Sequence, residues 1–166
     1  MISNELRETI DTQFRIKNLL WIGLTVGLIL YFFAVYFITT GKEPNPNISQ
    51  MTQYVFAGFG FLLIIIAIAI RKFSFSEDRL KSVCLSAQIN SDDWTEKITK
   101  YLSRQQVFYI ISLAINDSIG ILGIAIGFIS RDINKALPYI LVAILLNIWV
   151  YPKKERFLAN LQKTGQ

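Results

Sequence analysis

One acidic residue, Asp117, stands alone in a long apolar segment of this chain and is its clearest candidate for chemistry. The segment, residues 107–130, reads VFYIISLAINDSIGILGIAIGFIS and contains no other charged side chain; the polar Asn116 comes directly before the acid. A charged carboxylate in the middle of a membrane-spanning helix costs several kcal/mol. Asp117 and Asn116 are therefore the candidate site, either for binding a proton or an ion or for holding helices together.

The protonation state of Asp117 depends on whether another part of the chain places a basic side chain at the same depth in the membrane. No Lys or Arg occurs at that level in any apolar segment, so an ion pair within one chain is not expected and loss of water favours the neutral carboxyl. We predict a neutral Asp117 that is hydrogen-bonded within the bundle, to Thr25, Asn147 or a backbone carbonyl. A structural clamp, a proton or ion site and a contact with a partner membrane protein are its three interpretations.

Small residues line one side of the helix that carries the acid. On a helical wheel with about 100° per residue, this stripe is centred about 90° from the acid and comprises Asn116, Gly120, Gly123 and Gly127, with Ser112 and Ser130 at its edges. Glycines four apart let two helices approach closely, and such packing holds helices together in lipid. Gly123 and Gly127 form one such pair, and Gly23 and Gly27 form another in the first apolar segment. We predict packing within the chain at both pairs.

The residue inventory argues against catalysis and against a metal centre. The chain contains no His and a single cysteine, Cys84, which excludes His-based catalysis and a Cys/His metal site. Asp92, Asp93 and Glu96 are close in sequence, but they follow Ser91 and fit the start of a helix, where acids are favoured. We predict no enzyme activity, no metal and no cofactor.

Four apolar segments must position these residues, and a span takes about 20 residues. With a mean hydropathy of +0.41, the chain is predicted to be an all-α membrane protein, with one integral membrane domain over residues 1–166 and spans at 19–39, 52–70, 107–130 and 136–151. Short outer connections predict two antiparallel hairpins, spans one with two and three with four. Pro138 is expected in the first turn of the fourth span, and Asn147 is expected to bond to a neighbouring helix.

Basic residues are distributed unevenly between the two sides of the predicted bundle. Fourteen Lys and Arg residues flank the spans on the side of both termini and of residues 71–106, whereas three, Lys42, Arg131 and Lys135, lie on the other side. The positive-inside rule then places both termini in the cytoplasm of a multi-pass plasma (inner) membrane protein. This distribution accounts for the net charge of +5 without a nucleic acid, so the expected partner is the lipid bilayer.

Two polar segments are predicted to form short amphipathic helices on the cytoplasmic side. In residues 1–18, Leu6, Ile10 and Phe14 share one face, either of a helix on the membrane surface or of an extension of the first span. Residues 71–106 carry two sets at helical spacing: Leu80, Val83, Cys84 and Ala87, then Trp94, Ile98, Tyr101 and Leu102. We predict a helical hairpin or two short helices that cover the bundle there.

The stretch Ile111-Ser-Leu-Ala-Ile-Asn-Asp-Ser-Ile-Gly-Ile-Leu-Gly-Ile-Ala-Ile resembles the carboxylate helix of rotary ATP synthase c subunits. In that family a single Glu or Asp lies in an apolar helix with a glycine further on, as Gly123 follows Asp117. With the fourth span and the tail, residues 107–166 resemble small bacterial four-helix membrane proteins whose helix is c-subunit-like. The resemblance implies that Asp117 takes up a proton; the first hairpin and the long loop differ from c subunits, so rotary transport is not implied.

Two functions from different classes follow. The first is a non-catalytic integral membrane component that acts by helix packing with itself or with another membrane protein. The alternative is a proton- or ion-binding membrane component that uses Asp117 and Asn116. Asp117→Asn separates the two, because an amide still forms hydrogen bonds but does not carry a proton.

Overall fold

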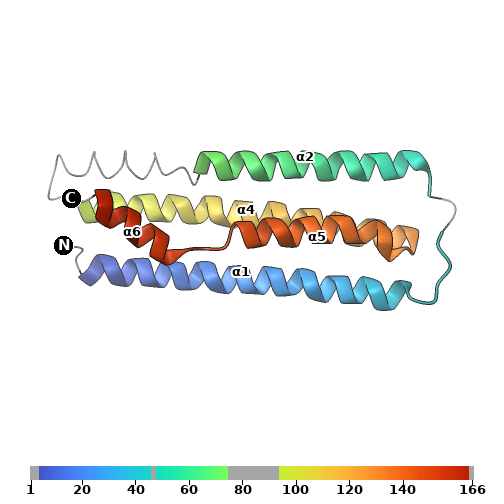
Figure 1. The fold of residues 1–166 in the computed structure, drawn as a ribbon, viewed down its shortest axis with the longest axis horizontal. Coiled ribbons are helices and arrows are strands. Elements are labelled where there is room, and N and C mark those ends of the chain that lie inside the picture. The colour runs from blue at the N-terminus through green and yellow to red at the C-terminus, as the bar shows by residue number, and fades with distance from the viewer. Residues whose placement is uncertain (1–3, 46–47, 75–93, 165–166) are drawn as a thin grey trace.

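The described part of the chain in the computed structural model, residues 4–45, 48–74 and 94–164, is folded as helices joined by short connections. The helices are α1 (Asn4–Thr39), α2 (Gln50–Ser74), α4 (Trp94–Ser130), α5 (Ile133–Trp149) and α6 (Lys154–Thr164). The four long helices lie side by side, and α6 lies at the end that also holds the start of α1 (Figure 1). The all-helical prediction is confirmed for these residues. The helix expected over residues 80–87 and the helix start at Ser91 to Asp93 lie outside them.

Three of the helices are long and apolar enough to cross a membrane. These stretches are Leu6–Thr39, Gln50–Lys72 and Glu96–Ser130. The fourth apolar helix, α5, is shorter, with 17 residues, which gives a length of about 25 Å at about 1.5 Å per residue. Length and composition therefore favour a multi-pass membrane protein.

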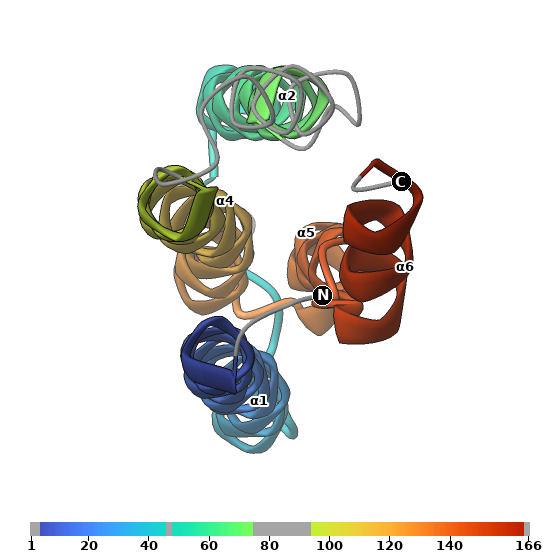
Figure 2. The ribbon, with the colours of Figure 1, turned by 90° about the vertical axis from the view of Figure 1, so that its left-hand side faces the viewer.

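The helix order in space differs from the predicted pair of hairpins. α4 and α5 pack against each other as an antiparallel hairpin, but α4 lies between α1 and α2 (Figure 2). The prediction that the first two spans pack as a hairpin is therefore wrong. The connection after α1 crosses the end of α4, where the Asn45 backbone N–H donates to the Ser130 carbonyl at 2.9 Å. This crossing carries the chain to the far side of α4 before α2 begins.

The polar segments at the other end extend the long helices and do not form separate ones. α1 is continuous from Asn4 and α4 from Trp94, so the prediction of separate short helices is wrong for residues 94–106. α6 packs across both extensions and is the only separate short helix in the described part. An apolar cluster joins the three helices: Leu6, Ile10 and Phe14 of α1, Ile98 and Leu102 of α4, Phe157 and Leu161 of α6.

A tight turn connects α4 to α5. Arg131 adopts a left-handed backbone conformation with φ of 53°, and the Asp132 side chain caps α5 by accepting from the Asn134 N–H. Because of this cap the helix begins at Ile133, three residues before the predicted start. Pro138 is consequently inside the helix and not in its first turn.

Candidate functional site

The structure places Asp117 near the middle of α4, half-buried, on the border of the outer surface. Its carboxyl group has no hydrogen bond or ion pair with any residue in the described ranges. The prediction that Asp117 is hydrogen-bonded within the bundle is therefore wrong for this part of the chain. The reason is angular: the residue that faces the interior at this level is Asn116, about 100° away around the helix.

Asn116 forms the polar clamp that was expected of its neighbour. Its side-chain amide donates to the Oδ1 atom of Asn147 on α5 at 3.0 Å, and both residues are buried. From α1, the Trp21 indole N–H donates to the Asn147 backbone carbonyl at 2.7 Å. Asn147 thus connects three helices, and hydrogen bonds of this kind add to packing where water is excluded.

Further polar side chains continue from this clamp toward the end of the bundle that holds the start of α1. Lys17 is 2% exposed, and its ammonium group donates to Gln105 Oε1 at 3.2 Å and lies 4.9 Å from the centre of the Phe14 ring. The Tyr109 hydroxyl donates to the Lys17 backbone carbonyl at 3.2 Å. We call the whole set the polar column; it comprises Lys17, Trp21 and Thr25 of α1, Gln105, Tyr109, Ser112 and Asn116 of α4, and Asn147 of α5.

The polar column has hydrogen-bonding capacity that the described residues do not fill. Three of its buried side-chain atoms lack a partner there: Thr25 Oγ1, Ser112 Oγ and Asn147 Nδ2. Thr25 lies one turn from Trp21 on α1, and Ser112 lies one turn from Asn116 on α4, so all three atoms lie around the Asn116–Asn147 bond. Buried polar atoms of this kind are usually satisfied by water or a ligand.

Sequence reasoning missed half of the polar column. Lys17 was counted only as a basic residue flanking the first span, and neither Gln105 nor Tyr109 was singled out. The signal was the spacing: polar side chains recur at positions 17, 21 and 25 of α1 and at positions 105, 109, 112 and 116 of α4, which is one face of each helix.

The glycines of the α4 stripe lie at helix contacts. A Cβ atom added to Gly120 would collide with the Leu28 side chain of α1. One at Gly123 would lie 2.9 Å from the Ala136 carbonyl oxygen of α5, and one at Gly127 would lie 2.8 Å from the Ala136 Cβ. Glycine at these positions allows α4 to approach both neighbours closely.

The glycine pair of α1 has a different environment. An added Cβ at Gly23 or at Gly27 would meet no described atom within 4 Å. The prediction that this pair packs within the chain is therefore wrong for the described residues. Both glycines belong to the outer surface of α1, because the side of α1 that faces its neighbours is occupied by Leu28 and Val35.

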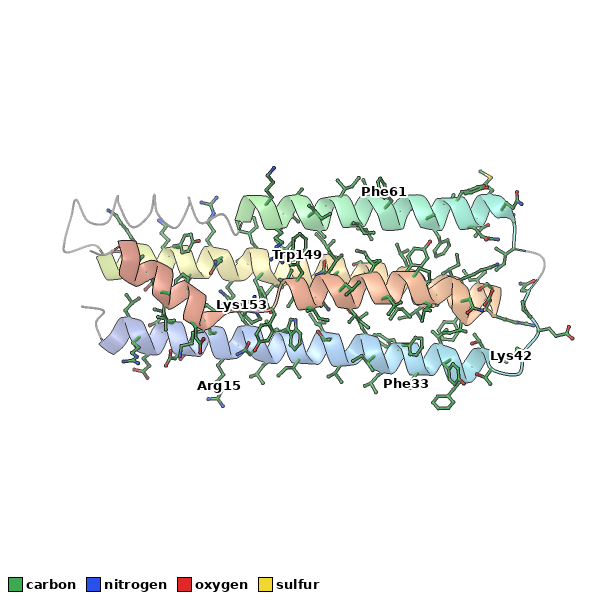
Figure 3. The ribbon with its side chains drawn as sticks, viewed as in Figure 1. Arg15, Phe33, Lys42, Phe61, Trp149 and Lys153 are labelled. Carbon is green, nitrogen blue, oxygen red and sulfur yellow. The ribbon has the colours of Figure 1, made fainter. Side chains whose placement is uncertain are left out.

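Large apolar side chains cover much of the remaining outer surface. Phe33 on α1 and Phe61 on α2 point away from the bundle (Figure 3) and are 48% and 66% exposed. Where α2 and α5 end, the Arg71 guanidinium lies 3.8 Å from the centre of the Trp149 ring and donates to the Trp149 carbonyl. A soluble monomer rarely exposes this much contiguous apolar surface, whereas lipid covers it at no cost.

Neither the lone acid nor the polar column forms a metal-binding or nucleophilic arrangement in the described ranges. No group of three His, Cys, Asp or Glu side chains that could hold a metal ion occurs there. Comparisons with protein-family models, with curated proteins and with solved structures found no match to this chain. The arrangement of the side chains themselves therefore carries the functional argument.

Proposed function

We propose that this protein is an integral membrane component that acts by helix packing and association, with itself or with another membrane protein, and not by catalysis. The observation that carries the proposal is Asp117, which lies in an apolar helix, is half-buried at the outer border and has no partner among the described residues. In lipid such a group is costly. A neighbouring membrane helix that supplies a hydrogen bond removes this cost.

The proposal includes a topology with both termini in the cytoplasm of the plasma membrane. It is supported by the basic residues, which are concentrated at the end that holds α6 and the start of α1, and by the Arg71–Trp149 contact, a pairing typical of the membrane interface. Single cysteines at Ser49 and Arg131, in a Cys84→Ser background, should react with an impermeant thiol reagent from outside intact cells. Reaction from the cytoplasmic side would overturn the topology.

The test of association uses the protein in its native membrane. The wild-type chain is extracted directly into polymer-bounded native discs, and the mass of the protein in each disc is measured. We expect complexes larger than one chain for the wild type and for Asp117→Asn, because an amide still donates and accepts hydrogen bonds, and mostly single chains for Asp117→Leu. Single chains for all three proteins would contradict the proposal.

A second function is favoured by the unfilled polar column. The unpaired atoms of Thr25, Ser112 and Asn147 around the Asn116–Asn147 bond offer hydrogen bonds to water or an ion. This supports a proton- or ion-binding component that uses Asp117 with Asn116, its neighbour in sequence. The resemblance of α4 to the c-subunit carboxylate helix accords with it. Titration of the carboxyl infrared band of Asp117 in lipid, with Asp117→Asn as the blank, is the test. A band that changes near neutral pH or with sodium supports this function, and a band that stays constant contradicts it.

A further inference from the structure

We infer that the outer side of the α1–α4 pair is the interface for a second copy of this chain. This inference rests on the proposed function and names its partner. The first step is the register of the two helices: Leu28 lies at Gly120 and Val35 lies at Gly127, so α1 and α4 run parallel with a constant difference of 92 (120 less 28, and 127 less 35). The same difference places Asp117 level with position 25, between Gly23 and Gly27.

The second step is the direction in which these residues point. On α1, Trp21 and Phe32 lie about 20° and 40° to one side of Leu28. Trp21 bonds to α5 and Phe32 packs against a cluster made largely of α5 residues, whereas Gly27 lies about 100° to the other side. α5 is therefore on one side of the α1–α4 pair, as seen from α1, and Gly27 is on the opposite side.

The same test from α4 gives the same answer. Gly123, which faces Ala136 of α5, lies about 60° to one side of Gly120, and Asp117 lies about 60° to the other side. The glycine pair and the acid thus share the side of the α1–α4 pair that faces away from α5. We call this surface the outer α1–α4 face; its centre comprises Gly23 and Gly27 of α1 and Ala114 and Asp117 of α4.

The outer α1–α4 face differs from the surfaces that suit lipid. Two glycines, one alanine and one acid lie at its centre, beside the larger exposed side chains of Tyr31 on α1 and of Ile110 and Ile121 on α4. The exposed side of α2 has no acid and carries the bulky side chains Phe59, Phe61, Leu62 and Ile65. Small residues expose the backbone and allow another helix to approach, and polar side chains among them form hydrogen bonds across such contacts. The small residues and the acid at its centre are therefore typical of a helix–helix contact in a membrane.

A second copy fits this face because the carboxyl group is complementary to itself. A neutral carboxyl has one donor and an acceptor, so two of them can exchange hydrogen bonds. A two-fold axis along the membrane normal brings the same patch of both chains together and keeps the two Asp117 side chains at equal depth. No basic or other foreign group is needed to satisfy either acid.

The experiment measures self-association of the purified full-length protein in lipid vesicles. Chains carrying a fluorophore at the C-terminus are reconstituted over a series of lipid dilutions, and the fraction of paired chains is obtained from photobleaching steps. We expect a dimer for the wild type, an association constant lowered about tenfold by Asp117→Leu and by Gly27→Leu, and little change for Asp117→Asn.

Gly58→Leu is the matched control, because Gly58 is also a glycine with open space around it but lies on α2. It should leave the association constant unchanged. Single wild-type chains at every dilution, or an equal loss in Gly58→Leu and Gly27→Leu, would overturn the inference. If single purified chains coincide with larger complexes in native discs, the second copy is excluded as the partner while the proposed function stands.

Discussion

Two glycine pairs with the same four-residue spacing have opposite surroundings in this bundle. At Gly127 of the α4 pair, an added Cβ would lie 2.8 Å from the Ala136 Cβ and 2.9 Å from Val35 Cγ1. At Gly23 and Gly27 of α1 it would meet nothing described within 4 Å. The spacing allows close approach of a second helix, but it does not say which helix approaches.

The difference follows from the places of the two helices in the bundle. α4 has α1, α2 and α5 as neighbours, whereas α1 lies at the edge of the bundle (Figure 2). A glycine pair on α4 therefore meets a neighbour of the same chain, and one on the free side of α1 does not. The open pair is for this reason the one that we assign to contact between chains.

The largest expected difference in stability comes from adding one methyl group, by Gly→Ala, to the glycine pair of α4 and to that of α1. Gly123→Ala places a Cβ 2.7 Å from the Tyr139 Cβ and 2.9 Å from the Ala136 carbonyl; because the second atom is backbone, α4 and α5 must separate, at a cost of about 1–3 kcal/mol. Gly23→Ala meets nothing and should stabilise α1 by up to about 1 kcal/mol through helix propensity. The measurement is reversible unfolding in mixed micelles, followed by helical circular dichroism.

The two substitutions change the same atom in the same residue type, so each is the control for the other. The contrast predicts free energies of unfolding that move in opposite directions. If Gly123→Ala is as stable as Gly23→Ala, the contact between α4 and α5 is looser than the structure has it. If Gly23→Ala is strongly destabilising in micelles that hold single chains, the α1 pair is covered within one chain.

The helical segments were accessible from the sequence because apolar runs report directly on helices. Their pairing was not. The rule that joins consecutive spans as hairpins holds for α4 and α5 and fails for α1 and α2, because the bonds of Asn45 to the end of α4 belong to tertiary structure and leave no periodic signal. The length of α4 was missed for a related reason. Residues 94–106 are polar and were predicted as a helix separate from the third span, whereas in the structure they continue α4 and pack against α1 and α6.

The candidate site shows where sequence reasoning stops. The helical wheel identified the stripe that contains Asn116 and the glycines. The hydrogen bond between helices, however, was predicted for Asp117, and in the structure it joins Asn116 to Asn147. A rotation of 100° between adjacent residues decides which one faces inward, and composition cannot resolve it. Sequence reasoning includes Lys17 only among the basic residues that flank the first span. In the structure Lys17 is buried, and its ammonium group lies over the rings of Phe14 and Tyr109.

An intermediate effect is expected from the hydrogen bond that lies beside the packed stripe. Asn116→Leu and Asn147→Leu each leave one buried amide without a partner and should destabilise the bundle by about 1–2 kcal/mol. The double variant should cost less than the sum, with a coupling of about 0.6–1.7 kcal/mol. Unfolding free energies of the four proteins in one micelle composition give this coupling.

The Asn116–Asn147 cycle contains its own control. The Trp21 bond goes to the Asn147 backbone carbonyl, so it survives both substitutions and keeps α1 in place. A coupling of zero would mean that each amide forms a hydrogen bond with water as readily as with the other amide. In that case the polar column would be hydrated, and close packing of the α4 glycines would hold the three helices together without help from this pair.

The smallest expected effect sharpens the comparison on a third helix. α2 contains Gly60, where an added Cβ would lie 2.8 Å from the Tyr139 ring, and Gly58, where it would meet nothing. Because the obstacle is the far part of a side chain and not backbone, the ring can rotate away, and Gly60→Ala should cost less than about 1 kcal/mol. Gly58→Ala should be neutral or stabilising. The measurement is again unfolding in the same micelles. If Gly60→Ala lowers the free energy of unfolding as much as Gly123→Ala, then side chains in this bundle move aside no more easily than backbone does. In that case the space around a glycine alone decides how costly an added methyl group is.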